Sequence, residues 1–104
     1  MKRKPELVVL ATLIAAVAGH SAAAQDLANG RRLSERWCTE CHVIGAAGER
    51  PGRAFPFAAI AAKPSVNADM IAAFLMMPHA TMPNPPLSRN DARDIAAFIM
   101  AMKK

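Results

Sequence analysis

The sequence predicts an all-α fold for the part of the chain that follows residue 24. Apolar residues recur there at intervals of three and four, the spacing that places them on one face of a helix. The chain has no Tyr, few Val and Ile, and no stretch in which apolar and polar residues alternate, so nothing favours a strand. We expect residues 25–104 to form one small helical domain and to be a monomer.

The first 24 residues have the order of a secretory signal peptide. Residues 2–4 are basic, residues 7–18 are apolar, and the small residues 22–24 offer a cleavage site. The apolar run is short for a transmembrane helix. We therefore expect cleavage after Ala24, a periplasmic location and no stable membrane insertion afterwards, with an uncleaved N-terminal anchor as the alternative.

Removal of this segment leaves 80 of the 104 residues. A domain of this size has only a marginally stable core unless a metal or prosthetic group stabilises it further. The whole chain has 13 Lys and Arg against 8 Asp and Glu, and residues 1–24 contain three of the former and one of the latter, so the remaining domain carries a formal charge of +3. Its basic residues are scattered, which makes nucleic-acid binding a poor interpretation.

The first helix is predicted to begin after Asp26, a suitable N-cap, and to reach about Cys41. Gly30 is unfavourable inside a helix by about 1 kcal/mol relative to Ala, which suggests that another helix approaches closely there. The expected apolar face consists of Leu27, Gly30, Leu33 or Ser34, Trp37 and Cys41.

Glycine and proline interrupt residues 43–54, which we expect to form a loop. A short helix over residues 55–62 follows, with Pro56 near its start. A third helix, capped by Ser65 or Asn67, is predicted to extend to about residue 77. Its buried side is expected to contain Met70, Ile71, Phe74, Leu75 and Met77.

Residues 78–86 contain four prolines and are expected to form an ordered loop or an extended strap. Ser88 and Asp91 then fit the S-x-x-D start of a last helix that runs to about Met102. The apolar stripe of that helix comprises Ala92, Ile95, Ala96, Ile99 and Met102, with Phe98 beside it.

The most informative stretch is Cys38-Thr39-Glu40-Cys41-His42, which reads C-x-x-C-H, the attachment signature of a c-type haem. Each thiol can add across a haem vinyl group to give a thioether. The adjacent imidazole is then carried beneath the iron as an axial ligand, a role that its nitrogen suits. We therefore expect one covalently bound haem c, held by Cys38, Cys41 and His42.

Three other interpretations of this stretch are weaker. A redox dithiol normally opens a helix in a βαβ unit, and no strand is predicted here. A zinc site needs four ligands, whereas the chain has only these two Cys. A chance disulfide would explain neither the following His nor the Met-Pro pair downstream.

The opposite axial position of the iron could be filled by Met, by His or by no residue. Met82 lies in the non-helical segment Thr81-Met82-Pro83, where an extended loop could bring its thioether to the iron. His79 is the rival and would give a bis-His haem. Position alone does not decide whether Met82 is a ligand or a core methionine.

The attachment motif, Met82-Pro83 about forty residues later and the final Asp94-Ile95-Ala96-Ala97-Phe98-Ile99 segment together resemble a small class I cytochrome c. The resemblance covers essentially the whole domain. It implies about four helices packed around one haem, with His42 and Met82 as axial iron ligands.

The same resemblance implies that Gly30 meets Phe98 where the first and last helices cross. It also implies that a proline carbonyl accepts the ring N–H of the proximal histidine, with Pro56 as the candidate and Pro51 as the alternative. Ser34 stands where many relatives carry an aromatic residue, and we expect Trp37 to supply that packing.

The resulting functional expectation is a periplasmic electron carrier rather than an enzyme, with periplasmic or membrane redox proteins as partners. The low dielectric around the haem is expected to come from Trp37, Phe57, Ile60, Phe74 and Leu75. One alternative is a dedicated haem subunit of a periplasmic dehydrogenase or oxidase. Another is a catalytic or gas-binding haem with an open distal site, against which Met82 argues.

Overall fold

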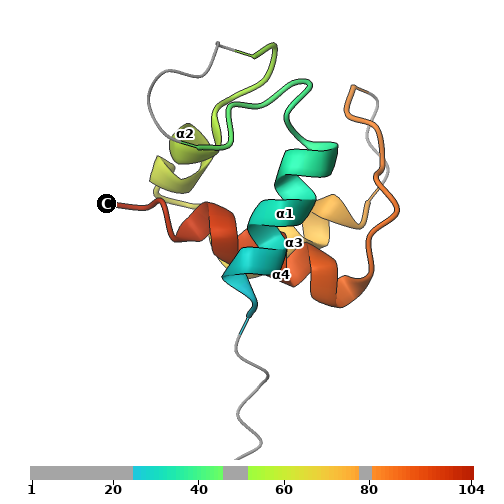
Figure 1. The fold of residues 1–104 in the computed structure, drawn as a ribbon. Helices are drawn as coiled ribbons and strands as arrows, with labels where there is room; N and C mark the ends of the chain where they lie inside the picture. Colours follow the sequence, from blue (N-terminus) through green and yellow to red (C-terminus); the bar gives the residue numbers. More distant parts are fainter. Residues whose placement is uncertain (1–24, 46–51, 78–80) are drawn as a thin grey trace, which may run out of the picture.

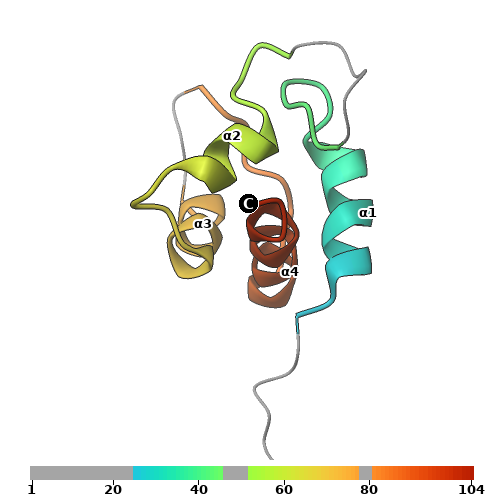
Figure 2. The same ribbon diagram turned by 90° about the vertical axis from the view of Figure 1, so that its left-hand side faces the viewer.

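A computed structural model describes residues 25–45, 52–77 and 81–104 of the protein. These residues contain four helices and no strand: α1 (Leu27–Trp37), α2 (Phe57–Ala62), α3 (Ala68–Leu75) and α4 (Arg89–Met100). α4 packs against the other three. Figure 2 shows α4 nearly end-on between α1 and α3, with α2 above them. The predicted all-α fold is confirmed.

Three helices begin at side chains that accept a hydrogen bond from the helix's own first turn. Asp26 accepts from the amide of Asn29 at the start of α1, and Asn67, rather than Ser65, caps α3. Ser88 and Asp91 form a reciprocal capping box at α4. These bonds satisfy amide groups that have no partner inside the helix, which explains why the helices start where they do.

The buried face of α1 differs from the predicted one. Gly30, Ser34 and Cys38 recur at every fourth position and are buried, whereas Leu27 is 49% exposed and Trp37 is 40% exposed. Leu27 and Trp37 are therefore largely outside the contact with α4, whereas Leu33 is partly buried against the core. The helix is in contact with another backbone along this face, and only small side chains fit there.

α1 and α4 cross at Gly30, as predicted. A Cβ atom placed on Gly30 would lie 2.1 Å from the carbonyl oxygen of Asp94 and 3.0 Å from Cβ of Phe98. The first of these distances is far inside van der Waals contact, and the atom in the way belongs to a helix backbone. The predicted meeting of Gly30 and Phe98 is therefore confirmed, and the unfavourable helix propensity of glycine is offset by the close packing that it permits.

Asp94 is a buried charged residue that the sequence analysis did not single out. Its carboxylate, which is on α4, accepts hydrogen bonds from the backbone N–H of Asp26 (2.9 Å) and from Nδ2 of Asn29 (2.8 Å). Both donors are at the amino-terminal end of α1, where the helix dipole favours a negative charge. This carboxylate thus ties the start of α1 to the middle of α4.

The core lies between α4 and its neighbours. It contains Ile71 and Leu75 from α3 together with Ala92, Ile95, Ala96 and Ile99 from α4. The prediction for α3 is wrong in part, because Met70 and Phe74 are each 50% exposed and Met77, which lies beyond the end of the helix, is 53% exposed. α3 packs on α4 alone among the described helices and therefore buries only a narrow stripe of its surface. The buried face predicted from its hydrophobic residues is wider than this stripe.

Among the described helices, none is long and apolar enough to span a bilayer. The predicted leader, residues 1–24, lies outside the described residues.

We predict that Gly30→Ala destabilises the protein by about 1–3 kcal/mol, the range for overpacked cores, because the added methyl group would overlap the α4 backbone. Chemical denaturation of the haem-loaded protein measures the effect. Ala28→Leu, at an exposed position of the same helix, is the control and should unfold close to wild type. An unchanged midpoint for Gly30→Ala would show that the helices do not cross in close contact.

A second prediction concerns pH. Hydrogen bonds from the backbone of Ser88 and from the side chain of Asn29 lower the pKa of Asp91 below its usual 3.8. A lowered pKa in the folded state means that the ionised carboxylate contributes stability above pH 3.8, and that this contribution is lost as the pH falls through the lowered pKa. Asp91→Asn should therefore be less stable than wild type at neutral pH, and the difference should shrink in acid. Denaturation of both proteins across this range tests the prediction, and a pH-independent difference contradicts it.

Candidate haem-binding site

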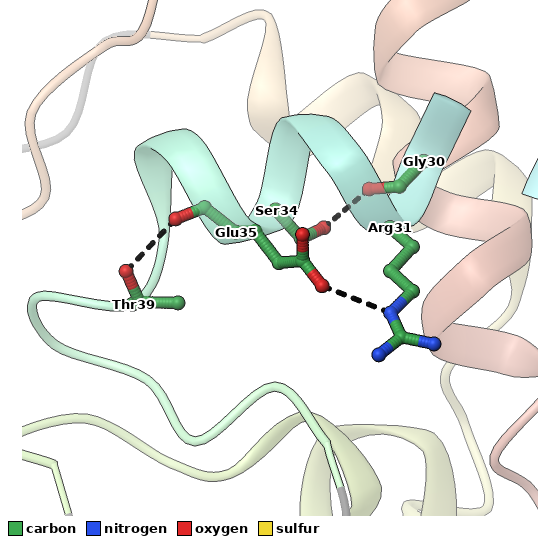
Figure 3. Close-up of polar contacts among 5 residues, drawn as sticks. All are labelled: Gly30, Arg31, Ser34, Glu35 and Thr39. Carbon is green, nitrogen blue, oxygen red and sulfur yellow. Dashed lines mark hydrogen bonds and ion pairs between the residues drawn. The ribbon is translucent and has the colours of Figure 1, made fainter. Parts of the chain in front are cut away.

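The C-x-x-C-H stretch forms a turn that directly follows α1, rather than its last helical turn as predicted. The amide of Cys38 donates to the carbonyl of Ser34 (2.9 Å), and the amide of His42 donates to the carbonyl of Cys38 (2.9 Å). The hydroxyl of Thr39, inside the motif, donates to the carbonyl of Glu35 (3.0 Å), as Figure 3 shows. The motif thereby satisfies carbonyl groups at the end of α1 and is anchored to the helix.

Ser34 is completely buried, and its hydroxyl donates to the carbonyl of Gly30 at 2.7 Å (Figure 3). The expectation that Trp37 replaces an aromatic residue at this level is wrong. The indole is half-exposed and lies under the guanidinium of Arg36, 4.9 Å from the ring centroid. Ser34 is one helical turn beyond Gly30, on the same face, where the nearness of α4 favours a small side chain.

The two cysteines of the motif are free thiols in this structure, Cys38 buried and Cys41 half-buried. Burial raises the pKa of the Cys38 thiol to about 11, and a hydrogen bond with Ser34 acts in the opposite direction. Neither sulfur is consumed by a disulfide.

His42 is oriented by a backbone carbonyl. Its Nδ1 lies 2.6 Å from the carbonyl oxygen of Phe55. A carbonyl can only accept, so Nδ1 carries the hydrogen and Nε2 keeps the lone pair that an iron ligand needs. The prediction that Pro56 is the acceptor is wrong by one residue. The Pro56 carbonyl accepts instead from the amides of Ala59 and Ile60 at the start of α2. The alternative, Pro51, lies outside the described residues.

The segment that carries Phe55 runs alongside the attachment motif. The amide of Ala54 donates to the carbonyl of Cys41 and that of Phe57 to the carbonyl of Val43, both at 2.9 Å. A Cβ atom on Gly52 would lie 2.1 Å from the carbonyl oxygen of Cys41 and 3.2 Å from the amide nitrogen of His42. Gly52 thus lets the two segments touch. In the sequence, Gly52 is one of several glycines of the predicted loop, and no pattern in the sequence distinguishes it from the others.

Aromatic rings connect His42 to the helix crossing. The imidazole and the buried ring of Phe57 have centroids 5.3 Å apart, and Phe57 meets Phe98 edge-on at 6.3 Å. Phe98 is the residue of α4 whose Cβ faces Gly30. The position of the imidazole therefore depends on the core as well as on its own loop.

Met82 reaches the core from a different direction. Its side chain is half-buried and packs against the hydrophobic core. Figure 1 shows the segment 81–88 and helix α2 on opposite sides of the carboxyl-terminal end of α1, and in Figure 2, viewed from the α2 side, that segment passes behind α2. His79, the rival ligand, lies outside the described residues.

Comparison with known proteins identifies the family of this chain. No protein-family model matches the chain, and no solved structure matches it. Cytochrome c-552 of Bradyrhizobium diazoefficiens is 39% identical to it over 92 residues, which span 88% of each protein. The chain belongs to the small c-type cytochromes. The four helices accordingly form a small class I cytochrome c fold.

Membership of this family implies a covalent haem c with its iron, and the described residues of the cytochrome fit that group. Two free thiols are separated by two residues, and the adjacent imidazole is held in the tautomer that leaves Nε2 available. No cluster of three or more His, Cys, Asp or Glu that could hold a bare metal ion occurs in the described part of the chain. Two thiols and one imidazole at this spacing are the groups that a c-type haem takes.

Five apolar residues are predicted to surround the haem. Phe57 and Leu75 are buried and Ile60 is half-buried, whereas Trp37 and Phe74 are 40% and 50% exposed. Phe57 is the member of this group that contacts His42. The apolar contact with His42 thus comes from α2, through Phe57.

We predict that Gly52→Ala weakens the cytochrome by about 1–3 kcal/mol, because the methyl group would displace the backbone that joins Cys41 to His42. The displacement should also alter the spectrum of the haem protein, which reports the axial ligands. Ala58→Ser, which adds one heavy atom at an exposed position of α2, should change neither quantity. Wild-type stability and spectrum for Gly52→Ala would contradict the packing described here.

Proposed function

We propose that this cytochrome is a periplasmic electron carrier that holds one haem c through thioether bonds to Cys38 and Cys41, with His42 and Met82 as the axial ligands of the iron. The observation that carries the proposal is the 2.6 Å contact between Nδ1 of His42 and the Phe55 carbonyl. That contact orients the imidazole and raises its basicity as a ligand. Bound haem supplies one-electron chemistry, and the protein positions it and adjusts its potential.

Two features support Met82 as the second ligand. Its segment lies on the opposite side of the α1 terminus from α2, whose Phe57 contacts His42 (Figure 1). Pro83 restricts the backbone beside it, which reduces the entropy lost when the thioether is held in one place. A Met thioether opposite a histidine raises the potential of a haem.

The buried residues around His42 act in the same direction. Phe57 is 3% exposed and covers one side of the imidazole. A dry, apolar surrounding disfavours the additional positive charge of the oxidised iron. Phe57 therefore favours the reduced state in addition to the ligands, by shielding one side of the imidazole from water.

The leader predicted for residues 1–24 supports export, and the haem-attaching stretch is consistent with an exported protein. Electron donors and acceptors are then periplasmic or membrane redox proteins that form small, transient contacts with the carrier. A dedicated subunit of a periplasmic dehydrogenase or oxidase would use the same haem chemistry and differ in its interface alone.

Optical spectra and mass spectrometry of the purified protein test the proposal. We expect a mass increase of one haem that survives acid–acetone treatment, and a weak far-red band in the oxidised protein, which marks a Met–iron bond. Met82→Ala should abolish that band, lower the potential and open the iron to added ligands while the haem stays attached. Met70→Ala, a half-exposed methionine of α3, is the matched control and should retain all wild-type properties.

Extraction of the haem by acid–acetone would disprove the thioether bonds. If His79→Ala removes the sixth ligand while Met82→Ala leaves the spectrum unchanged, the haem has two histidine ligands. If the reduced wild-type protein already binds carbon monoxide and neither variant matters, the iron has an open position and the electron-carrier assignment fails.

A further inference from the structure

Asn29 and Gly30, in the first turn of α1, form the only Asn-Gly pair of the chain. This dipeptide is the one most prone to spontaneous deamidation, because glycine has no side chain to hinder attack by its backbone nitrogen on the side-chain carbonyl carbon of the asparagine. The attack closes a five-membered succinimide, and the side-chain nitrogen leaves as ammonia with the proton that the backbone nitrogen loses. Water then opens the ring to aspartate or isoaspartate, so the reaction needs no other reagent.

The fold keeps the attacking nitrogen unavailable. The backbone N–H of Gly30 donates to the carbonyl oxygen of Asp26 at 2.9 Å, as a helix hydrogen bond. Gly30 is also buried against α4, where a Cβ atom on it would lie 2.1 Å from the carbonyl oxygen of Asp94. The five-membered ring cannot close while the chain keeps helical dihedral angles here. The reaction therefore requires the start of α1 to unfold and to separate from α4.

The side chain of Asn29 is held at both ends. Its Nδ2 donates to the carboxylates of Asp94 (2.8 Å) and Asp91 (3.3 Å) on α4, and its Oδ1 accepts from the guanidinium of Arg32. Both groups that face Nδ2 are acceptors, so the position requires a donor. The amide is therefore part of the contact between α1 and α4 as well as one of the two reacting groups.

The deamidated product does not fit this position. A carboxylate at residue 29 has no donor, and it would face the carboxylates of Asp91 and Asp94 within hydrogen-bonding distance. Like charges at this separation repel strongly. Isoaspartate would also add a methylene group to the main chain next to Gly30, where the two helix backbones are in contact. A converted chain therefore cannot restore the crossing.

We propose that Asn29 is a deamidation site that the folded protein keeps closed, and that its conversion in an unfolded chain prevents α1 of that chain from packing on α4. Folded molecules are thus preserved, whereas a chain that stays unfolded loses the ability to fold. The inference is independent of the proposed function, because these groups lie at the end of α1 opposite the attachment motif.

The first test follows deamidation of the purified protein by peptide mass spectrometry, in mildly alkaline buffer with and without guanidinium chloride. Asn29 should react at least about tenfold faster in the unfolded chain, since only locally opened molecules react in the folded protein. Pro85→Gly is the control, because it places a glycine after Asn84, which is exposed in the segment before α4. Asn84 of this variant should react at similar rates with and without denaturant.

The second test uses Asn29→Asp, which reproduces the aspartate product. Its melting temperature should be lower than that of wild type by about 5 °C or more. Asn67→Asp is the matched control, because the Asn67 side chain caps α3 by accepting from the amide of Met70 at 2.8 Å, which a carboxylate does equally well. If Asn29→Asp does not fold, its combination with Asp94→Asn places a donor opposite the new carboxylate and should restore folding.

Equal rates at Asn29 in the folded and unfolded protein overturn the proposal, as does the absence of reaction at this residue in the unfolded chain. Protection of Asn84 as strong as that of Asn29 would show that the crossing is not what closes the site. The predicted consequence for α1 is wrong if Asn29→Asp melts like wild type, if Asn67→Asp shares its loss, or if the variant combined with Asp94→Asn stays unfolded.

Discussion

The crossing of α1 and α4 at Gly30 determines where the rest of the molecule can lie. Because no side chain separates the two backbones at that point, the helices approach closely enough for the Asp94 carboxylate to reach the amide groups at the start of α1. α1 is thereby held at its beginning by a charge-assisted hydrogen bond and near its middle by backbone contact. Its far end, which carries Cys38, is eight residues beyond Gly30 on a rigid rod, about 12 Å along the axis.

The imidazole is positioned by a second set of contacts that begins at the same crossing. Phe98 faces Gly30, Phe57 packs edge-on against Phe98, and His42 packs against Phe57. Two consecutive carbonyls then accept hydrogen bonds from different groups. The Phe55 carbonyl accepts from His42 and orients the imidazole, and the Pro56 carbonyl accepts from the first turn of α2. A change in the separation of α1 and α4 would therefore move both the cysteine side chains and the imidazole of His42.

The four helices, the side-chain caps of α1, α3 and α4 and the crossing at Gly30 could be predicted from the sequence, since each depends on local spacing or on one small residue. The prediction failed for Trp37 because it ranked positions by hydrophobicity, whereas the close contact of α1 with α4 selects for small side chains. It failed for Phe74 because α3 buries a narrower stripe, at Ile71 and Leu75, than its hydrophobicity suggests. The role of Asp94 was missed because the groups that donate to its carboxylate, on Asp26 and Asn29, are distant from it in sequence. The acceptor for His42 was missed because every residue has a carbonyl, and only the course of the chain decides which one is within reach.

The small side chains at these contacts also bear on why the haem would be joined covalently. Ala61, Ala92 and Ala96 are fully buried, and together with Gly30 and Ser34 they let the helices pack closely while removing little apolar surface from water. Since hydrophobic stabilisation grows with the apolar area buried, a core of this kind contributes less per residue than one built from Leu and Phe. A large apolar group bonded to Cys38 and Cys41, which immediately follow α1, would add the missing contact area at the end of the helix pair. The attachment that supplies the redox centre would then also stabilise the domain that surrounds it.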